Sequence, residues 1–469
     1  MKRITLQEIG FAWLAAFVLI LAFASWRVVS QRQMSPMQLR GSGDTLIIAA
    51  AGDFLAGEPM PSRETDRGYG DVVQILKGTS LALTTLEQDL LDEKNVPASR
   101  ESSLLRWPYG TTREGKELRD IGFTLVSLAN NHATDYGTLG MKQTWGILDH
   151  EGVLHAGAGD NLQQAMAPVY VGTAPRRVAV IAVTTSATAE SRATYTQGEI
   201  LGRPGVNVLR YSPRVTVDPS TFVTLSRSRL HTHPATNHDP SELMLSGTVI
   251  RKGQKTTVEF VANEQDSNSI LAQIKIARSN ADVVIVMLHS HEPSNESDTP
   301  AGFAQQFAHA AVDAGANLVV GDGPHQLRGI ELYHGQLIFY SLGNFSFQSG
   351  TINPSAVDVY DRGSDLFGLT LGTMENRESY PATPPDSPRW WESVIAITTF
   401  DHGELKSIQL QPVDLGNDLP MSQRGVPRRA SSERGAEILQ RLAVLSQHFG
   451  TLLRIENGQG SIDIDQSGH

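Results

Sequence analysis

The sequence predicts an α/β fold, and two observations lead to this prediction. Short apolar runs typical of buried strands alternate with longer segments of helical periodicity. Several of these apolar runs end in a polar residue. Such an alternation is typical of a parallel sheet covered by helices, which binds its ligands at the carboxyl ends of the strands. We therefore expect the functional residues at those strand ends.

The predicted strands are the runs rich in Val, Ile, Leu or Ala, and the predicted helices lie between them. Strands are expected at 45–51, 81–86, 123–128, 169–171, 178–183, 283–288, 317–320, 329–333 and 336–341. Helices are expected at 113–121, 138–150, 268–278 and 301–314. In the second helix, periodicity predicts that Leu139, Thr144, Ile147 and Leu148 point inward.

Breaks in this alternation indicate the domain organisation. A core domain is expected over 44–350, with an insertion at 206–266 in which residues 247–260 predict a β-hairpin. Residues 351–469 are expected to form a C-terminal extension that completes or flanks the core. Its predicted elements are strands at 391–400 and 405–410 and a helix at 432–448.

The N-terminus predicts attachment to a membrane. Two basic residues precede the uncharged run Ile9–Trp26, which is just long enough for a spanning helix of about 17–25 residues. We expect residues 1–30 to be a retained anchor and 31–43 a polar linker, with the main domain outside the cytoplasm. The triplet Ala22-Phe23-Ala24 leaves a cleaved signal peptide as the alternative.

The composition excludes several classes of protein. The 469-residue chain has a formal net charge of −11, which argues against nucleic acid as its main partner. It contains no cysteine, so disulfides, thiolate metal sites and cysteine nucleophiles are excluded. The Gly-x-x-x-x-Gly-Lys-Ser/Thr and Gly-x-Ser-x-Gly motifs are absent, which excludes a P-loop and weakens an α/β-hydrolase interpretation.

Carboxylate, amide and imidazole side chains gather where the predicted strands end. They are Asp53, Glu87, Asn131, His132, His289, His291, Asp322 and His325. Oxygen and nitrogen ligands without thiolate suit Mn, Mg, Fe, Zn or Ca ions. Taken singly, Asp53 and Asp322 also fit turn positions, Glu87 fits a solvated carboxylate, and one of the two histidines His289 and His291 fits a structural role. The repetition of one pattern at several strand ends is what predicts a metal site.

Longer motifs surround these residues and resemble those of a known family. The motifs are Gly52-Asp53-Phe54, Ser127–Gly137, His289–Glu292 and Gly321–Phe345. They resemble the bacterial capsule-synthesis CapA/PgsA family, which is associated with poly-γ-glutamate production and related to the calcineurin-like metallophosphoesterases. The resemblance covers residues 45–350 in the expected order.

The resemblance implies a four-layer α/β/β/α metallophosphoesterase-like sandwich that holds a pair of divalent metal ions (Mn, Mg, Fe or Zn). Metal ligands are implied at Asp53, Asn131, His289 and His325, and Glu87 and Asp322 are added to them as carboxylates at neighbouring positions. The catalytic role of stabilising or protonating the leaving group is implied for His132. Supporting roles are expected for Asn130, Asp135, His291, Glu292 and Asn344.

Two positions depart from the family pattern. Thr85-Leu86-Glu87 stands where the family commonly has Asn-Leu-Glu, and Gly321-Asp322 stands where it commonly has Gly-His. An aspartate shifts metal preference towards Mn or Mg and away from Zn. One of the two metal positions is therefore expected to be weaker.

Three functions agree with these observations. The leading expectation is a membrane-anchored protein of capsule or poly-γ-glutamate biosynthesis, working with other synthesis subunits, whose metal-activated water attacks a phosphoester or an acyl centre. The alternative is a non-catalytic scaffold or export subunit of the same complex. A third is an amide hydrolase that shortens the γ-linked polymer.

Overall fold

The computed structural model describes residues 38–41, 43–95, 97, 109–228, 232–234, 241–245, 248–348 and 387–464. The predicted anchor at 1–30, most of the linker and residues 351–386 lie outside this range. Among the helices in the described residues, none has both the length and the apolar character that crossing a membrane requires.

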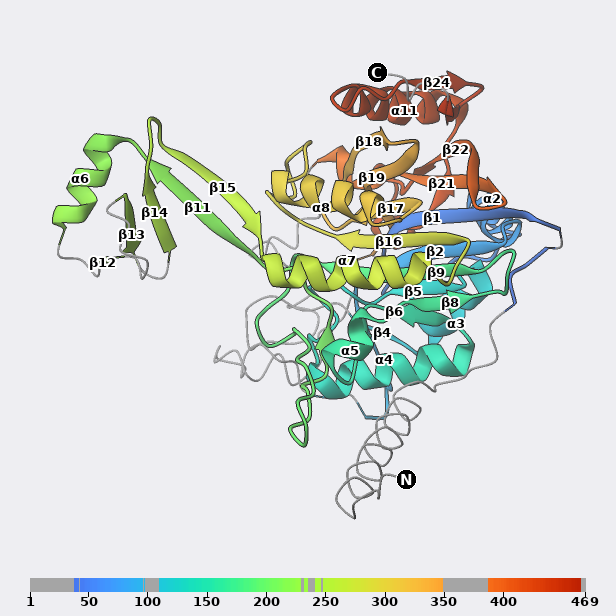
Figure 1. Cartoon of the computed structure of the whole chain (residues 1–469). Helices are drawn as coiled ribbons and strands as arrows, with labels where there is room; N and C mark the ends of the chain where they lie inside the picture. The colour runs from blue at the N-terminus through green and yellow to red at the C-terminus, as the bar shows by residue number, and fades with distance from the viewer. Residues whose placement is uncertain are drawn as a thin grey trace, which may run out of the picture.

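Two β-sheets form the centre of the molecule (Figure 1). The larger has ten strands, and its main path runs β24 (Leu453–Glu456), β25 (Gln459–Ile462), β22 (Glu404–Asp414), β21 (Glu392–Asp401), β1 (Thr45–Leu55), β2 (Leu81–Leu86), β5 (Leu125–Ser127) and β6 (Leu154–Ala156), with β20 (Asn344–Phe347) paired to β1 and β23 (Arg428–Arg429) paired to β22. The smaller has six strands in the order β18 (Leu327–Tyr333), β19 (Gln336–Leu342), β17 (Leu318–Asp322), β16 (Val283–His289), β9 (Val178–Thr184) and β8 (Val169–Val171). The prediction of an α/β fold is confirmed.

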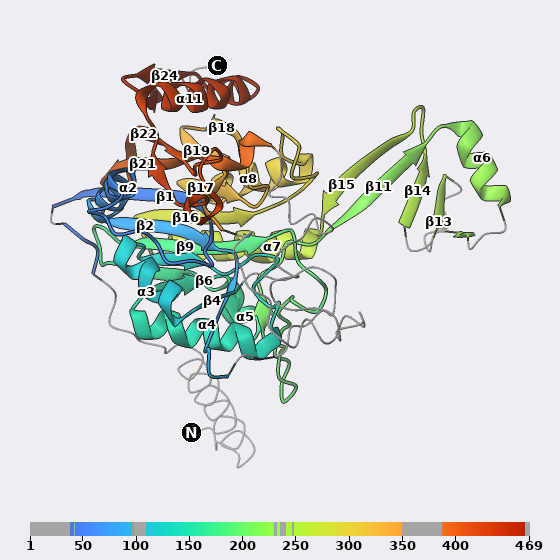
Figure 2. The same ribbon diagram turned by 180° about the vertical axis from the view of Figure 1, so that it is seen from behind.

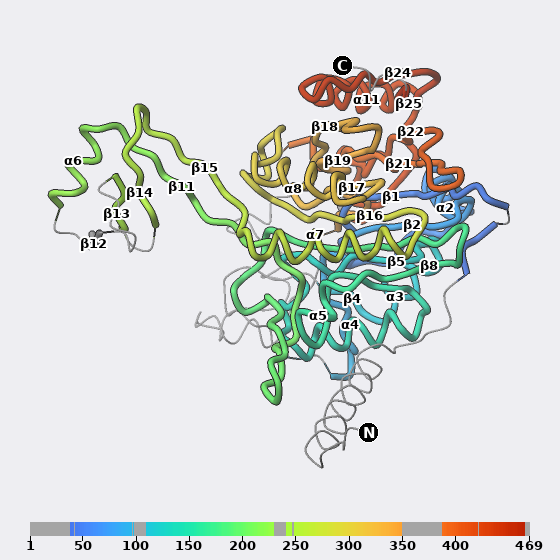
Figure 3. The backbone as a smooth tube through the Cα atoms, in the orientation of Figure 1, coloured from blue at the N-terminus to red at the C-terminus, as the bar shows by residue number. Residues whose placement is uncertain are grey.

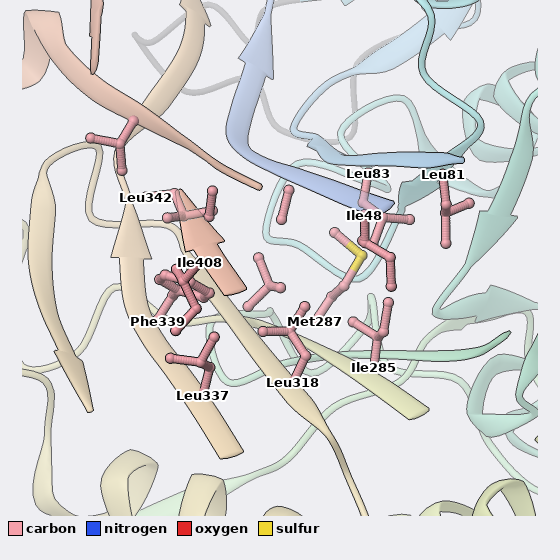
Figure 4. Close-up of a cluster of buried hydrophobic side chains, with 14 of the residues drawn as sticks. Ile48, Leu81, Leu83, Ile285, Met287, Leu318, Leu337, Phe339, Leu342 and Ile408 are labelled. Atoms are coloured by element: carbon pink, nitrogen blue, oxygen red, sulfur yellow. The ribbon is translucent and has the colours of Figure 1, made fainter. Parts of the chain in front are cut away.

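The two sheets pack face to face through apolar side chains (Figure 4). Ile48 and Leu83 of the larger sheet belong to one buried cluster with Ile285, Leu318 and Phe339 of the smaller sheet. Each of these side chains is at most 1% exposed. Burial of one such side chain contributes about 1.5–3 kcal/mol, so this cluster fixes how the strand ends of the two sheets meet.

Helices cover the outer face of each sheet. The larger sheet is covered by α2 (Arg67–Lys77), α3 (Thr112–Ile121) and α4 (Gly137–Glu151), and the smaller by α5 (Leu162–Met166), α7 (Glu264–Arg278) and α8 (Gly302–Asp313). Figure 2 shows α3 and α4 below the sheets and α8 beside β17 from behind. Of the residues predicted to face inward on α4, Thr144 and Leu148 are buried, whereas Leu139 is 54% exposed, which corrects that prediction.

The C-terminal segment belongs to the same core. β21 pairs antiparallel with β1 along Thr45–Ala50, and β22 continues the sheet beyond it. Helix α11 (Ser432–Gln447) buries Ile438 and Leu442 in the cluster between the sheets. The described residues after 387 therefore stabilise the strand that carries Asp53.

The described residues between 211 and 262 form a separate small sheet that projects from the body as an arm (Figure 1). Its strand order is β12 (Thr232–Pro234), β13 (Glu242–Leu245), β14 (Thr248–Lys252), β11 (Tyr211–Val217) and β15 (Thr257–Ala262), with α6 (Pro219–Arg227) packed on one face. Figure 3 traces the chain out along β11 and back along β15. The predicted hairpin at 247–260 is wrong, because β11 lies between β14 and β15 and pairs with both.

Candidate metal centre

The strand register places the candidate residues side by side. Asp53 on β1 is the register partner of Thr85 on β2, and His289 on β16 is the register partner of Asp322 on β17. Register partners on neighbouring strands point to the same face of a sheet. The Thr85 hydroxyl reaches Asp322 from the opposite sheet, so both pairs face the space between the sheets.

Asp53 lies within its strand and not just past it as predicted. β20 pairs with residues 53–55 and thereby extends β1 beyond the apolar run. This pairing needs a close approach at Gly52, where a Cβ atom would lie 1.8 Å from the carbonyl oxygen of Gly343. Glycine is therefore required before Asp53.

One group of possible ligands contains Asp53, His289 and Asp322, whose ligand atoms lie within 4.8 Å of one another. His289 Nδ1 is 2.7 Å from Asp322 Oδ1 and 3.5 Å from Asp53 Oδ1. The backbone N–H of Gly323 donates to Asp53 Oδ2 at 3.0 Å. All three side chains are fully buried.

A second group contains Glu87, His291 and His325, within the same 4.8 Å limit. Glu87 lies between the imidazoles: its Oε1 is 3.6 Å from His291 Nε2, and its Oε2 is 3.6 Å from His325 Nδ1. Glu87 Oε1 is also 3.6 Å from His289 Nε2. The Glu87 carboxylate therefore joins the two groups.

The amide of Asn131 faces the same space. Its Oδ1 lies 2.8 Å from His289 Nε2 and 3.2 Å from His291 Nε2, and these two nitrogens are 3.0 Å apart. The imidazoles of His289 and His291 thus point at one position together with Asn131 and Glu87, although one of them was expected to be structural.

Buried oxygen atoms without partners show that this donor set fits a cation. Asp53 Oδ1 and both carboxylate oxygens of Glu87 are buried and accept no hydrogen bond within the described residues. An unpaired buried carboxylate is costly unless a cation or a proton compensates it. The residues present therefore fit one or two divalent metal ions.

The electrostatics of the site agree with this interpretation. Burial, followed by the charge of Asp322, raises the pKa of Asp53. Burial, followed by the charge of Asp53, raises the pKa of Glu87 well above its usual range. Burial opposes a charge on His289, yet its hydrogen bond to Asp322 and the nearby Asp53 and Glu87 carboxylates raise its pKa well above the ordinary value. Burial lowers the pKa of His325 to about 4, as suits a neutral ligand.

His132 lies at the edge of the site. Its side chain is 12% exposed, and its Nε2 is 4.0 Å from Glu87 Oε1. Its Nδ1 is 2.7 Å from Asp135 Oδ2. Asn130 fixes the turn before it: Asn130 Oδ1 accepts the His132 N–H at 2.9 Å, and its Nδ2 donates to the Leu86 carbonyl at 2.7 Å. The structure thus brings His132, Asn130 and Asp135 to the site.

The two other residues expected to support the site differ in position. Asn344 Oδ1 lies 2.9 Å from His325 Nδ1, and its Nδ2 donates to the carbonyls of His325 and Trp390. Glu292 is outside both ligand groups. Its carboxylate accepts hydrogen bonds from the hydroxyl groups of Thr185, Ser186, Tyr211 and Ser290.

Four further residues around the site were not among the predicted site residues. Asn295 lies 2.7 Å from His291 Nδ1, and the Trp390 ring packs on His325 with centroids 4.6 Å apart. The buried Arg328 donates to backbone carbonyls of the loop that carries His291, including Ser294 and Ser297. Thr85 donates to Asp322. Of these, Arg328 and Thr85 lie in or beside motifs, but only the fold reveals their contacts.

A buried centre of carboxylates and imidazoles, placed where the strands of two helix-covered sheets meet, defines an α/β protein with a candidate metal site. Residues 47–349 match the family described as bacterial capsule synthesis protein PGA_cap, and the chain belongs to this family. The resemblance found in the sequence motifs is confirmed.

The chain is also similar to individual bacterial proteins. The chain is 34% identical over 430 residues to an uncharacterized protein of Sinorhizobium fredii, covering 89% of this chain and 93% of the relative. It is 26% identical over 381 residues to the capsule biosynthesis protein CapA of Bacillus anthracis, covering 79% and 77%. It is 28% identical over 224 residues to a probable polyglutamine synthesis accessory protein of Mycobacterium tuberculosis, covering 47% and 44%.

Proposed function

We propose that this protein is a metal-dependent hydrolase of capsule or poly-γ-glutamate biosynthesis, with a site like that of the metallophosphoesterases. Its CapA relatives support a role in capsule or poly-γ-glutamate biosynthesis. The observation that carries the hydrolase proposal is the set of buried carboxylate oxygens without partners, Asp53 Oδ1 and both oxygens of Glu87, facing three imidazoles. The layering of helices on two packed sheets supports the comparison with metallophosphoesterases.

The residues that would hold metal are Asp53, Glu87, Asn131, His289, His291 and His325. Bound divalent ions stabilise the charge that develops on attacking and leaving oxygens and acidify water. The chain itself supplies the dry surroundings in which such charges interact strongly, because Asp53, Glu87 and His289 are fully buried.

His132 is the proposed proton donor to the leaving group. Asp135 accepts from its Nδ1–H, which orients the ring and leaves Nε2 directed towards the Glu87 side of the site. A carboxylate in this position fixes the tautomer and orientation of the ring, so Nε2 is the His132 nitrogen that faces a substrate in the site.

We further propose that residues 1–30 anchor the chain in the membrane, with the described domain outside the cytoplasm and in contact with other synthesis subunits. The uncharged run Ile9–Trp26 supports this proposal. Cell fractionation tests it: the full chain is expected in the membrane fraction and a chain without residues 1–30 in the soluble fraction. A full chain found only in the soluble fraction would contradict it.

The hydrolase proposal is tested with the full chain purified in detergent. Elemental analysis is expected to find a divalent metal, and phosphomonoester, phosphodiester and poly-γ-glutamate substrates are each assayed for cleavage. His132→Ala is expected to keep the metal and lose about 10²- to 10⁴-fold in rate, whereas Glu87→Gln loses metal and activity together. His334→Asn is the matched control, because His334 is an exposed histidine whose positive φ asparagine tolerates.

The outcomes separate the three functions. Cleavage of a phosphoester supports the leading proposal, and shortening of poly-γ-glutamate alone supports an amide hydrolase. If capsule output is unchanged in His132→Ala and Asp53→Asn cells but lost when residues 1–30 are deleted, the protein is a scaffold and the hydrolase proposal is wrong.

A further inference from the structure

We propose that Asp322 is a positioning residue that orients His289 towards the metal, and that it is not itself a metal ligand. Thr85 completes the arrangement by fixing Asp322. This inference rests on the proposed metal site. It gives Asp322 a different role from Asp53, although both belong to the first group of possible ligands.

Both carboxylate oxygens of Asp322 already have partners. Oδ1 lies 2.7 Å from His289 Nδ1, and Oδ2 accepts from the Thr85 hydroxyl at 2.5 Å. In contrast, Asp53 Oδ1 and both oxygens of Glu87 have no hydrogen-bond partner in the described residues. The contacts therefore distinguish two kinds of carboxylate. Asp53 and Glu87 have oxygens available to bind a cation, whereas both oxygens of Asp322 are already hydrogen-bonded.

The backbone fixes this geometry. His289 and Asp322 are register partners on adjacent parallel strands, so their side chains leave the sheet next to each other. Thr85 lies in the larger sheet, where it is the register partner of Asp53. It contacts Asp322 of the smaller sheet across the space between the two sheets. Neither contact requires a loop to adopt a particular conformation.

The Nδ1 contact determines which nitrogen of His289 can bind a metal. A carboxylate that accepts from Nδ1–H places the lone pair of the neutral ring on Nε2. His289 Nε2 is the atom that meets Asn131 Oδ1 at 2.8 Å, His291 Nε2 at 3.0 Å and Glu87 Oε1 at 3.6 Å. Three acceptors around one ring nitrogen mark the cation position, and it lies on the side of His289 away from Asp322.

A carboxylate behind a ligating histidine raises the basicity of the ligand and fixes its orientation. Loss of such an interaction typically lowers metal affinity by about 10- to 100-fold without removing a ligand. Thr85→Val, which deletes only the hydroxyl donor, and Asp322→Asn, which keeps an oxygen for His289, are expected to weaken metal binding within this range.

The experiment measures Co²⁺ binding and the visible absorption spectrum of the bound Co²⁺ in the full-length protein. In Thr85→Val and Asp322→Asn, the affinity is expected to fall while the number of ions bound and the band positions stay as in the wild type. Asp53→Asn is the comparison variant: it replaces an anionic ligand by a weaker neutral one and is expected to change the spectrum or the number of ions. Asp322→Ala is expected to lose more affinity than Asp322→Asn.

Two results would overturn the inference. If Asp322→Asn shifts the bands or lowers the number of ions as Asp53→Asn does, Asp322 is a ligand, while the proposed metal site stands. If the wild type binds no Co²⁺, Mn²⁺ or Zn²⁺, both the inference and the metal-dependent function fail.

Discussion

His132 and Asp135 form a pair in which the carboxylate holds the imidazole, with Nδ1 and Oδ2 2.7 Å apart. The pair is close in sequence, three residues apart, and it lies beside Glu87 at a partly exposed edge of the site. The His132 ring is thus both oriented by a carboxylate and accessible from that edge, as a group that exchanges a proton with a substrate must be.

Asp135→Asn is expected to lower kcat and leave the metal content unchanged, because the asparagine no longer holds the His132 ring in one tautomer and orientation. The fall should be smaller than that of His132→Ala. Asp149→Asn is the matched control, since Asp149 lies 3.5 Å from another histidine, His155, elsewhere on the chain. Equal activity of Asp135→Asn and wild type would contradict the role of the pair.

Metal removal is expected to destabilise the protein. Without a cation, burial and a neighbouring charge oppose the ionisation of both carboxyl groups: the charge of Asp322 acts on Asp53, and the charge of Asp53 acts on Glu87. A metal at a concentration of 100 times its Kd stabilises the folded state by about 2.7 kcal/mol. Thermal unfolding with and without a chelator measures the change.

Glu87→Gln tests the effect of these buried charges directly, because it removes the Glu87 carboxylate, whose ionisation burial and the charge of Asp53 oppose. The metal-free variant is expected to unfold at a higher temperature than the metal-free wild type, and added metal should stabilise it less. If the metal-free variant is less stable than the metal-free wild type, the buried Glu87 carboxylate does not destabilise the protein and the prediction is wrong.

Gly52→Ala is expected to prevent the pairing of β1 with β20, because the new Cβ would meet the Gly343 carbonyl oxygen at 1.8 Å. Gly146→Ala is the control: the site has open space around it within α4, and alanine there should stabilise the helix by about 0.5–1 kcal/mol. Comparison of the two unfolding temperatures checks the prediction, which a stable Gly52→Ala protein would refute.

Glu117 is expected to make stability depend on pH. Burial raises its pKa from 4.5 to about 7 in the folded protein. The folded state then holds the proton more tightly than the unfolded chain, so this group lowers stability as the pH rises from about 4.5 to about 7. Relative to the wild type, Glu117→Gln should gain stability between about pH 5 and pH 8, as measured by thermal unfolding. Glu404→Gln, a change at an exposed residue, should show no such gain.

The sequence predicted the order of strands and helices well, since buried parallel strands such as 283–288 are continuous apolar runs. Pairing was harder. The alternation in 247–260 identified two strands but not the partner between them, which comes from 211–217. The convergence of Asp53, Glu87, Asn131 and His289 followed from the strand-end pattern, whereas their roles as ligands stay predictions.

Contacts between distant residues could not be foreseen. Trp390 follows the last recognisable motif and reaches His325 only because the C-terminal strands join the larger sheet. Thr85 and Asp322, the two departures from the family pattern, are 237 residues apart and hydrogen-bonded to each other. The two departures therefore contact each other in the folded protein, and the residue types alone did not indicate that they were linked.

The pairing of β21 with β1 affects how the chain can be divided. The segment that matches the family ends at residue 349, yet Thr45–Ala50 finds its antiparallel partner at Ala396–Asp401. A fragment ending at 349 would turn an interior strand into an open edge, whose unpaired backbone N–H and C=O groups are prone to pair with other chains and aggregate. The strand that carries Asp53 is therefore held on one side by residues from the far end of the chain, and the two ends must be present together for the centre to keep its shape.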